Sequence, residues 1–242
     1  MFFFKNYEQS ILELPVKETY TKEDLMTDSF LYAKDNKAEV FWAPFEDINR
    51  EAKVIILGIT PGWTQMELAY NYVRKNIGSE ERDILMRHAK RQASFGGKGI
   101  RKNLVDMLDG IELNKHLNIR SCSELYGEMN HLLHSSSLLR YPVFINKKNY
   151  SGSNPSMLKH PLLFQMIHEL FVPELKEVKG AVIIPAGKAV SDVLRFLVDE
   201  GTIRNQSILF DFPHPSGANG HRKKQYEEKK EWFKEQLKAH FH

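Results

Sequence analysis

The stretch Lys53-Val-Ile-Ile-Leu-Gly-Ile-Thr-Pro-Gly-Trp63 decides the fold, because an unbroken apolar run leads directly into a turn. Residues 53–59 show no polar alternation, which favours a strand covered on both faces of a parallel sheet. Gly58, Pro61 and Gly62 then indicate a tight connection into a helix. Ligands in such folds bind beyond the carboxyl ends of the strands, so this turn is the first place to look for a site.

Further apolar segments and helical periodicities surround this stretch. Residues 141–145 and 181–184 are predicted to be buried parallel strands, and residues 207–210 are a weaker fourth candidate. Helical spacing occurs over residues 66–73, 80–91, 100–108, 124–133, 155–170, 188–198 and 222–239. Strands that alternate with helices predict an α/β fold with a central parallel sheet.

The chain has 242 residues, of which 42% are hydrophobic and 27% charged, so it can bury a core without disulfides. No repeat or low-complexity linker interrupts it, which predicts a single domain over residues 1–242. Within that domain we expect a helical N-terminal extension over residues 1–45 and a motif-bearing core over residues 50–225. A C-terminal helix is expected over residues 222–242.

Cysteine usage and hydropathy favour a cytoplasmic protein. The one cysteine, Cys122, excludes an intramolecular disulfide and a multi-cysteine metal site. The longest apolar run, residues 54–59, is far shorter than the ~20 residues of a membrane span, and we expect no signal peptide. The ten histidines are scattered without metal-ligand spacing, so we expect no metal and no cofactor.

Each expected strand is followed by a loop of Gly, Pro or small polar residues, and these loops would gather at one end of one sheet. The loop after residue 58 lacks the lysine of a P-loop and the spacing of a dinucleotide fingerprint, so alone it is an ordinary turn. His214 differs, because Pro213 and Pro215 stiffen the backbone on both sides of it. A histidine held in this way is typical of a positioned functional group.

Positive charge is concentrated in one segment. The net charge is +3, but residues 74–102 carry nine Lys or Arg side chains against three acids. Such a segment could follow a phosphate backbone, whereas a solvated helix face is the commoner reason for a run of charge.

Two motifs carry a resemblance to the uracil-DNA glycosylase superfamily, closest to its single-strand-selective and mismatch-specific branches. Gly58-Ile59-Thr60-Pro61-Gly62 is similar to the first signature motif, and His214-Pro215-Ser216-Gly217-Ala218-Asn219 is similar to the last. Intermediate segments resemble the family in the right order: Ala93-Ser94-Phe95 with Arg101-Lys102-Asn103-Leu104, Phe144-Ile145-Asn146, Tyr150-Ser151-Gly152-Ser153-Asn154-Pro155, and Ile184-Pro185-Ala186-Gly187-Lys188-Ala189. The resemblance implies a three-layer α/β sandwich in which helices flank a central, mainly parallel sheet of four strands.

The resemblance implies a monofunctional DNA glycosylase that flips a nucleotide and hydrolyses its N-glycosidic bond. The base would be uracil or a 5-modified pyrimidine, for base excision repair or for defence against modified foreign DNA. His214 would stabilise the leaving base, and Thr60 would stand at the water-holding position, as the catalytic residues. Phe95 would stack on the base and Asn146 would read its edge. The other base-binding positions are Gly58, Ile59, Pro61, Gly62 and Trp63, and the DNA-binding positions are Ser216, Gly217, Asn219, Arg222, Gly187, Lys188, Lys98, Arg101, Lys147 and Lys148.

Three positions depart from the family pattern. Thr60 stands where many members carry Asp or Asn, so water activation is weak, comes from another acid such as Glu67 or Asp211, or is not needed. Gly62 stands where the most uracil-specific branch has an aromatic, which predicts a roomier pocket unless Trp63 refills the space. Ala218 is a poor wedge, which predicts a preference for single strands or weak pairs, or a wedge from residues 149–154.

Other interpretations stay open. Taken singly, Phe95 could belong to the core, Asn146 could cap a turn and His214 could be an ordinary loop histidine. A glycosylase-like protein without turnover would bind bases or single strands, and Thr60 favours that alternative while His214 opposes it. An α/β protein acting on another small molecule is the third class. The expected partner is DNA, single-stranded or with a flipped base, without a membrane; the oligomeric state is not readable, and a monomer is the default.

Overall fold

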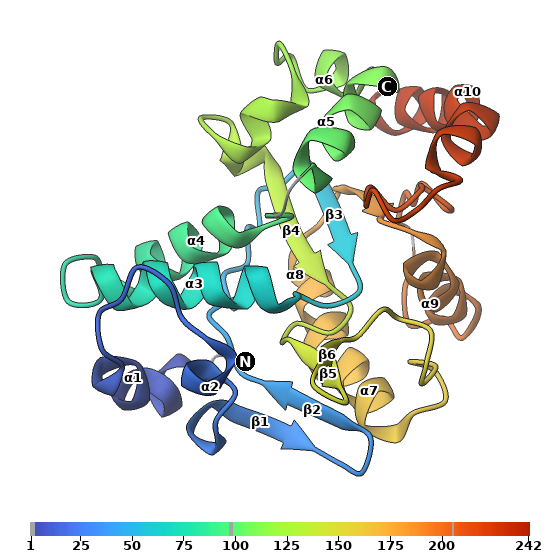
Figure 1. Ribbon diagram of the computed structural model, residues 1–242. Helices are drawn as coiled ribbons and strands as arrows, with labels where there is room; N and C mark the ends of the chain where they lie inside the picture. Colours follow the sequence, from blue (N-terminus) through green and yellow to red (C-terminus); the bar gives the residue numbers. More distant parts are fainter. Residues whose placement is uncertain (1–2, 97–98, 205) are drawn as a thin grey trace. The chain divides into compact units, whose positions relative to one another are not determined.

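The computed structural model describes residues 3–96, 99–204 and 206–242, and it is a mixed α/β protein (Figure 1). The chain divides into two compact units, each assembled from three separate stretches. The first unit comprises Met1–Asp47, Ile59–Gly96 and Ser137–Phe171. The second comprises Ile48–Gly58, Gly97–Ser136 and Val172–His242.

The second unit contains a parallel sheet with the strand order β4-β3-β7. β3 (Val54–Gly58) pairs in parallel with β7 (Val182–Pro185), and β4 (Leu133–Ser137) lies on the other side of β3. Every residue of β7 and the first four of β3 are buried, which is why both sequences are continuously apolar. The predicted strands at residues 53–59 and 181–184 are therefore confirmed.

The other two predicted strands behave differently. Within the described chain, residues 207–210 contribute one parallel bridge, between Ile208 and Ile183, instead of a full strand. Residues 141–145 were wrongly assigned to the parallel sheet, because β5 (Val143–Ile145) runs antiparallel to β2 (Ala38–Phe41) in the first unit. The parallel sheet thus has three strands and one bridge rather than the four predicted strands.

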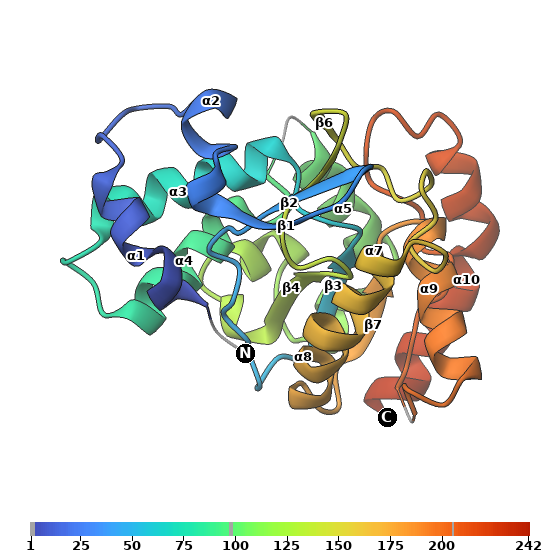
Figure 2. The same cartoon turned by 90° about the horizontal axis from the view of Figure 1, so that it is seen from below.

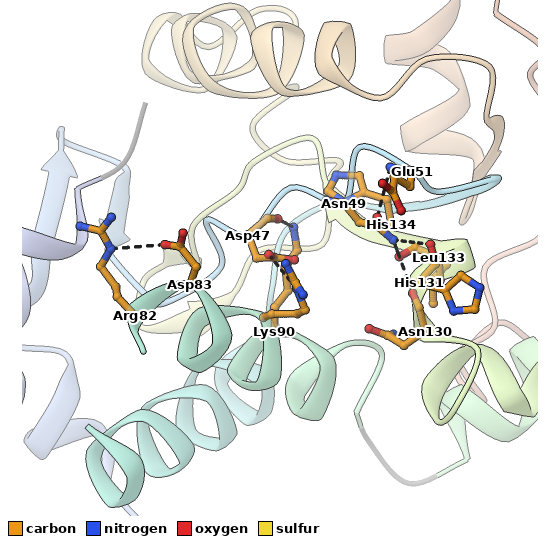
Figure 3. A network of polar contacts seen from close by, with 11 residues as sticks. Asp47, Asn49, Glu51, Arg82, Asp83, Lys90, Asn130, His131, Leu133 and His134 are labelled. Carbon is orange, nitrogen blue, oxygen red and sulfur yellow. Dashed lines mark hydrogen bonds and ion pairs between the residues drawn. The ribbon is translucent and has the colours of Figure 1, made fainter. Parts of the chain in front are cut away.

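The helix that periodicity predicts over residues 124–133 is not formed, and β4 begins at the last of these residues, Leu133. The structure has short 3-10 turns at Cys122–Tyr126 and Asn130–Leu132, and the strand follows directly. A half-buried asparagine fixes this segment, since the Asn49 side chain donates to the carbonyl oxygens of His131 and Leu133 at 2.8 and 2.9 Å (Figure 3). The Asn49 backbone amide also donates to His134 Nδ1 at 3.4 Å. β4 carries little apolar signal because His134 and three serines follow Leu133.

The described part of the second unit also contains the helices α5 (Ile100–Gly110), α6 (Leu113–His116), α8 (Val172–Glu177), α9 (Lys188–Asp199) and α10 (Arg222–Phe241). Helix α10 lies beside α5 and α6 in Figure 1, and the Tyr226 hydroxyl donates to Met107 O at 2.8 Å. Phe233 and Leu237 of α10 are fully buried. The predicted helices at residues 100–108, 188–198 and 222–239 are confirmed.

The first unit contains an antiparallel sheet with the order β1-β2-β5-β6, where β1 is Leu31–Lys34 and β6 is Lys148–Asn149. β1 and β2 are the paired blue strands of Figure 2. They correct the expectation that residues 1–45 are helical, because among the described residues 3–45 only α1 (Phe4–Glu13), α2 (Lys22–Leu25) and the 3-10 turn Asp28–Phe30 are helical. A short polar turn between two small apolar runs is a hairpin signal that helical periodicity hides.

The remaining helices of this unit are α3 (Trp63–Asn76), α4 (Arg82–Ala93) and α7 (Pro161–Met166), which continues as a π-helical turn over Ile167–Phe171. Helices α3 and α4 confirm the predictions at residues 66–73 and 80–91. The helix predicted over 155–170 begins later than expected, at Pro161. No helix in the described parts of the chain is long and apolar enough to cross a membrane.

A buried carboxylate organises the core of the first unit. Glu46 is 2% exposed and accepts hydrogen bonds from the backbone amides of Phe3 and Phe4, the indole of Trp42 and the hydroxyl of Tyr141. Four donors compensate the cost of burying the charge. The same bonds attach the start of α1 to this core.

Candidate functional site

His214 is the most constrained of the predicted site residues. Its Nδ1 accepts a hydrogen bond from the Ser216 backbone amide at 3.1 Å. Burial lowers the pKa of His214 below its usual value of 6.5, so the imidazole is uncharged at neutral pH. With Nδ1 used as an acceptor, the single ring proton resides on Nε2, which makes that atom a hydrogen-bond donor.

Gly187 packs against this histidine. It is the second residue after β7, and a Cβ atom added to it would lie 3.0 Å from His214 Cβ. Its φ of 105° is a conformation that residues with side chains rarely adopt, and its amide donates to Phe212 O at 2.8 Å. The glycine therefore lets the β7 turn approach the histidine loop closely.

Side chains of the second unit hold the loop after His214. Pro215 O accepts from Asn103 Nδ2 at 2.9 Å and from Arg222 Nη1 at 3.2 Å, and Ser216 O accepts from Arg222 Nη1 at 2.8 Å. The predicted DNA-binding residues Ser216, Asn219 and Arg222 thus lie together with His214, while Gly217 is exposed. Arg222 holds backbone carbonyls here, whereas the sequence assigned it to phosphate.

Asp211, one of the two acids considered for water activation, is bound to two cationic side chains. Its carboxylate accepts from Arg195 Nη2 at 2.7 Å and from Lys229 Nζ at 2.6 Å. These cations, with Arg195 contributing most, lower the pKa of Asp211 to about 2. The acid joins α9 to α10 as part of the scaffold.

The first signature motif straddles the two units, because Gly58 ends β3 and residues 59–62 belong to the first unit. The Thr60 hydroxyl donates to Tyr141 O at 2.8 Å and accepts from the Val143 amide at 3.2 Å. Ile59 O accepts from the Leu139 amide at 2.9 Å. Thr60 therefore fastens the turn to β5, a structural task that competes with holding a catalytic water.

Gly62 does not leave open space beside the turn. A Cβ there would lie 3.0 Å from Gln65 Oε1 and 3.1 Å from Asn149 Nδ2, so two polar side chains fill that position. The Trp63 amide, the first of α3, donates to Asn149 Oδ1 at 3.0 Å. The expected roomier pocket is not supported, and the residues that take the space are Gln65 and Asn149 instead of Trp63.

Asn146 and Lys147 form the two-residue turn between β5 and β6. Ile145 pairs with Lys148, and the two turn residues have φ values of 50° and 59°. Hairpins of this type require positive φ at both positions and favour Asn at the first. Asn146, Lys147 and Lys148 are all exposed, so the turn explains the asparagine without a bound base.

Phe95 has a different character, because it is half-buried and has a φ of 48° just after α4. A bulky aromatic in the left-handed region is a genuine outlier, and such strain concentrates at functional positions. Of the predicted site residues in the first unit, Phe95 is the one whose backbone strain favours a functional role.

Most of the basic residues predicted to follow phosphates have partners within the protein. Lys188 pairs with Asp192 at 2.6 Å, and the guanidinium of Arg101 lies 4.6 Å from the centre of the Tyr126 ring. Lys98 lies outside the described residues. Basic side chains of residues 74–102 also have partners, and Figure 3 includes two of these contacts. Two donate hydrogen bonds to backbone carbonyls, Arg74 to Leu14 O and Lys90 to Asp47 O. The others form ion pairs: Lys75 with Glu18, Arg82 with Asp83, Arg87 with Asp47 and Lys102 with Asp106. The solvated-face interpretation of this charge run is thereby favoured.

A buried polar group in the second unit escaped the sequence analysis. His134 and Glu174 are 3% and 2% exposed, and His134 Nε2 lies 2.8 Å from Glu174 Oε1, which also accepts from the Ser136 hydroxyl. His134 and Ser136 are two residues apart on β4 and so lie on one strand face, and the sequence predicted no strand there. This group ties α8 to β4.

The predicted site residues therefore fall into two groups. Gly187, His214, Ser216, Asn219 and Arg222 meet in the second unit, and Thr60, Gly62 and Trp63 meet the β5–β6 hairpin in the first. In the described ranges no cluster of three or more His, Cys, Asp or Glu residues could hold a metal ion.

These observations define a mixed α/β protein in which a parallel sheet carries an uncharged, donor-competent histidine on a braced loop. The chain is 38% identical over 240 residues to the uncharacterized protein YoxB of Bacillus subtilis (strain 168), a match covering 97% of this chain and 92% of YoxB. It belongs to the same family as YoxB. No family model matches the chain, and no solved structure matches it.

Proposed function

We propose that this protein is a monofunctional DNA glycosylase that releases a pyrimidine, either uracil or a 5-modified base, from DNA. The observation that carries the proposal is the state of His214: a half-buried, uncharged imidazole whose Nδ1 accepts a hydrogen bond from the Ser216 amide. Its Nε2–H is thus a fixed donor. Loss of one such donor to a developing anion costs about 10²–10³ in rate.

The chemistry needs that donor at one step. Cleavage of the bond between C1′ of the sugar and the base nitrogen sends both electrons to the base, and its carbonyl oxygen becomes negative. The Nε2–H of His214 hydrogen-bonds this oxygen without giving up its proton. Water then supplies the hydroxyl that joins C1′ and the proton that neutralises the base. A flipped nucleotide is required, because the bond is hidden in a stacked duplex.

We also propose an architecture, a binding partner and a cellular location for this protein. We propose that the parallel strands β4, β3 and β7, extended by the Ile183–Ile208 bridge, form the central layer of a three-layer sandwich. We further propose DNA as the partner and the cytoplasm as the location, with repair or defence as the role. The single cysteine, buried and reduced, is compatible with that compartment.

A second function, base or single-strand binding without turnover, is favoured by a specific observation. The Thr60 hydroxyl bridges two backbone groups of residues 141 and 143, and Asp211 is held by two cations, so neither is poised to activate water. Glu67 accepts from the Tyr20 amide at 3.2 Å and is the remaining acid of the original pair.

The test is a product assay on short oligonucleotides with one uracil, hypoxanthine or 5-substituted pyrimidine, each single-stranded and paired. Wild type, His214→Ala and the matched control His221→Ala, an exposed histidine of the same segment, are incubated with each and then heated in alkali. We expect cleavage at the abasic site with wild type and His221→Ala, and a loss of at least about 10²-fold with His214→Ala. Binding without cleavage by wild type would reject the glycosylase and favour the binding protein.

A further inference from the structure

One peptide unit connects the bracing side chains to the imidazole. The Pro215 carbonyl and the Ser216 amide are the two ends of the same planar group, and in a trans peptide they point in opposite directions. The carbonyl end accepts from Asn103 Nδ2 and Arg222 Nη1, at 2.9 and 3.2 Å. The amide end donates to His214 Nδ1 at 3.1 Å.

Rotation of that plane would break both sets of bonds together. The two bracing side chains come from regular helices, Asn103 from α5 and Arg222 from the first turn of α10. Arg222 also holds the next carbonyl, that of Ser216, at 2.8 Å. The peptide is thus fixed from two directions by elements outside the loop.

The hydrogen bonds at the two ends of this peptide also strengthen one another. Donation to a carbonyl oxygen polarises its peptide group, so the N–H at the other end becomes a stronger donor. A guanidinium gives a charge-assisted bond, which strengthens this effect. The prolines at 213 and 215 restrict the φ angles that the loop could use to compensate.

We propose that Asn103 and Arg222 are positioning residues that fix the tautomer of His214 by orienting the peptide between Pro215 and Ser216. Neither residue needs to touch a substrate for this task. The catalytic consequence rests on the proposed function, whereas the tautomer itself is a property of the protein alone.

The experiment is nuclear magnetic resonance of the imidazole nitrogens in the full-length protein, with His214→Gln used to identify the His214 signals. We expect wild type to show one dominant tautomer with the proton on Nε2. In Asn103→Asp, which keeps the shape but has no donor, and in Arg222→Ala, the ratio of Nε2–H to Nδ1–H forms should fall by about fivefold, the change expected for one lost hydrogen bond. Arg222→Lys retains the charge and should give a smaller fall.

Lys223→Ala is the matched control, because it removes an exposed charge next to Arg222 on the same helix. Its tautomer ratio should equal that of wild type. Circular dichroism confirms folding of each variant, and Asn103→Asp and Arg222→Lys stand in if Arg222→Ala does not fold. An unchanged ratio in folded Asn103→Asp and Arg222→Lys overturns the proposal, and so does an Nδ1–H form in wild type.

The outcome is separable from that of the product assay. If the ratio shifts as expected while wild type releases no base, the positioning role stands and the glycosylase proposal fails. If wild type releases base and Asn103→Asp loses activity with an unchanged tautomer, the positioning proposal fails and the glycosylase proposal stands.

Discussion

Asp211 offers a sharp test of how the His214 loop is anchored to the helices of the second unit. Its carboxylate accepts from Arg195 of α9 and Lys229 of α10, and its amide donates to Ser191 Oγ at 2.8 Å. Its φ of 65° is left-handed, a conformation that Asn tolerates as well as Asp does. Asp211→Asn therefore removes the charge and little else.

The size of the effect follows from the acidity of this group. Its ion pairs lower the pKa of Asp211 from 3.8 to about 2. At ~1.4 kcal/mol for each tenfold change in acidity, that fall would correspond to ~2.5 kcal/mol of stability. The side chain is 31% exposed and its two cations are 40% and 41% exposed, so screening by solvent reduces the expected loss to about 1 kcal/mol.

The assay is urea unfolding of wild type and Asp211→Asn at pH 7, 5, 4 and 3. A pKa lowered in the folded state gives a stabilisation that is present above pH 3.8 and is lost as the pH falls towards 2. We expect a difference of about 1 kcal/mol at pH 7 that shrinks below pH 4. Asp106→Asn, which disrupts an exposed pair with Lys102, should cost less than about 0.5 kcal/mol. Equal stabilities at pH 7, or a difference that persists undiminished at pH 3, would refute the reasoning.

Three other substitutions test the remaining contacts. Thr60→Val removes the hydroxyl that bridges the backbone of residues 141 and 143. We expect it to lower the free energy of unfolding in urea by about 1–2 kcal/mol and to leave base release per folded molecule unchanged. A loss of activity without a loss of stability would show that Thr60 is a catalytic residue. Glu46→Gln leaves buried donors of the first unit poorly matched and should cost about 2–4 kcal/mol in thermal unfolding, whereas a cost below ~1 kcal/mol would mean that the carboxylate is dispensable. Gly187→Ala forces a side chain into a φ of 105° and to 3.0 Å from His214 Cβ, so we expect a loss of about 1–3 kcal/mol and a shifted His214 resonance; an unshifted resonance would contradict the close packing.

The two strands that the sequence predicts correctly share one physical property. β3 and β7 are buried on both faces, so their composition alone distinguishes them from other elements. β4 could not be recognised in this way, because the buried His134 and the half-buried Ser136 on one of its faces are polar and bond to Glu174. Apolar periodicity detects burial that excludes polar groups, and it fails where a buried polar group supplies the contact.

The apolar run at residues 141–145 led to the opposite error. Val143–Ile145 is as apolar as a parallel strand, but it pairs with β2 and turns back at Asn146 and Lys147. An Asn followed by Lys is a weaker hairpin signal than Asn-Gly, so the turn was not recognised. The family resemblance gave Asn146 a base-reading role, and the turn geometry accounts for the residue without a bound base.

The constrained loop of His214 could be predicted from the sequence, whereas its hydrogen bonds to Asn103 and Arg222 could not. Two prolines around a histidine show in the sequence that the backbone is restricted. Asn103 lies 112 residues from Pro215 in the chain, and no local pattern marks their hydrogen bond. Contacts of this range depend on how helices pack, which a single sequence does not encode in any short motif.

The contacts at Thr60 and His214 together limit which mechanism a glycosylase of this kind could use. The Thr60 hydroxyl is bonded to backbone groups and Asp211 to two cations, so neither residue is available to make water attack early. The donor at His214 acts on the opposite partner, the departing base, and it helps most when the bond to the sugar is largely broken before water arrives. Turnover would therefore be strongly dissociative, with Thr60→Val nearly silent and His214→Ala severe. Similar losses in both variants would instead require an activated water, and the Thr60 hydroxyl would have to leave its backbone partners to hold it.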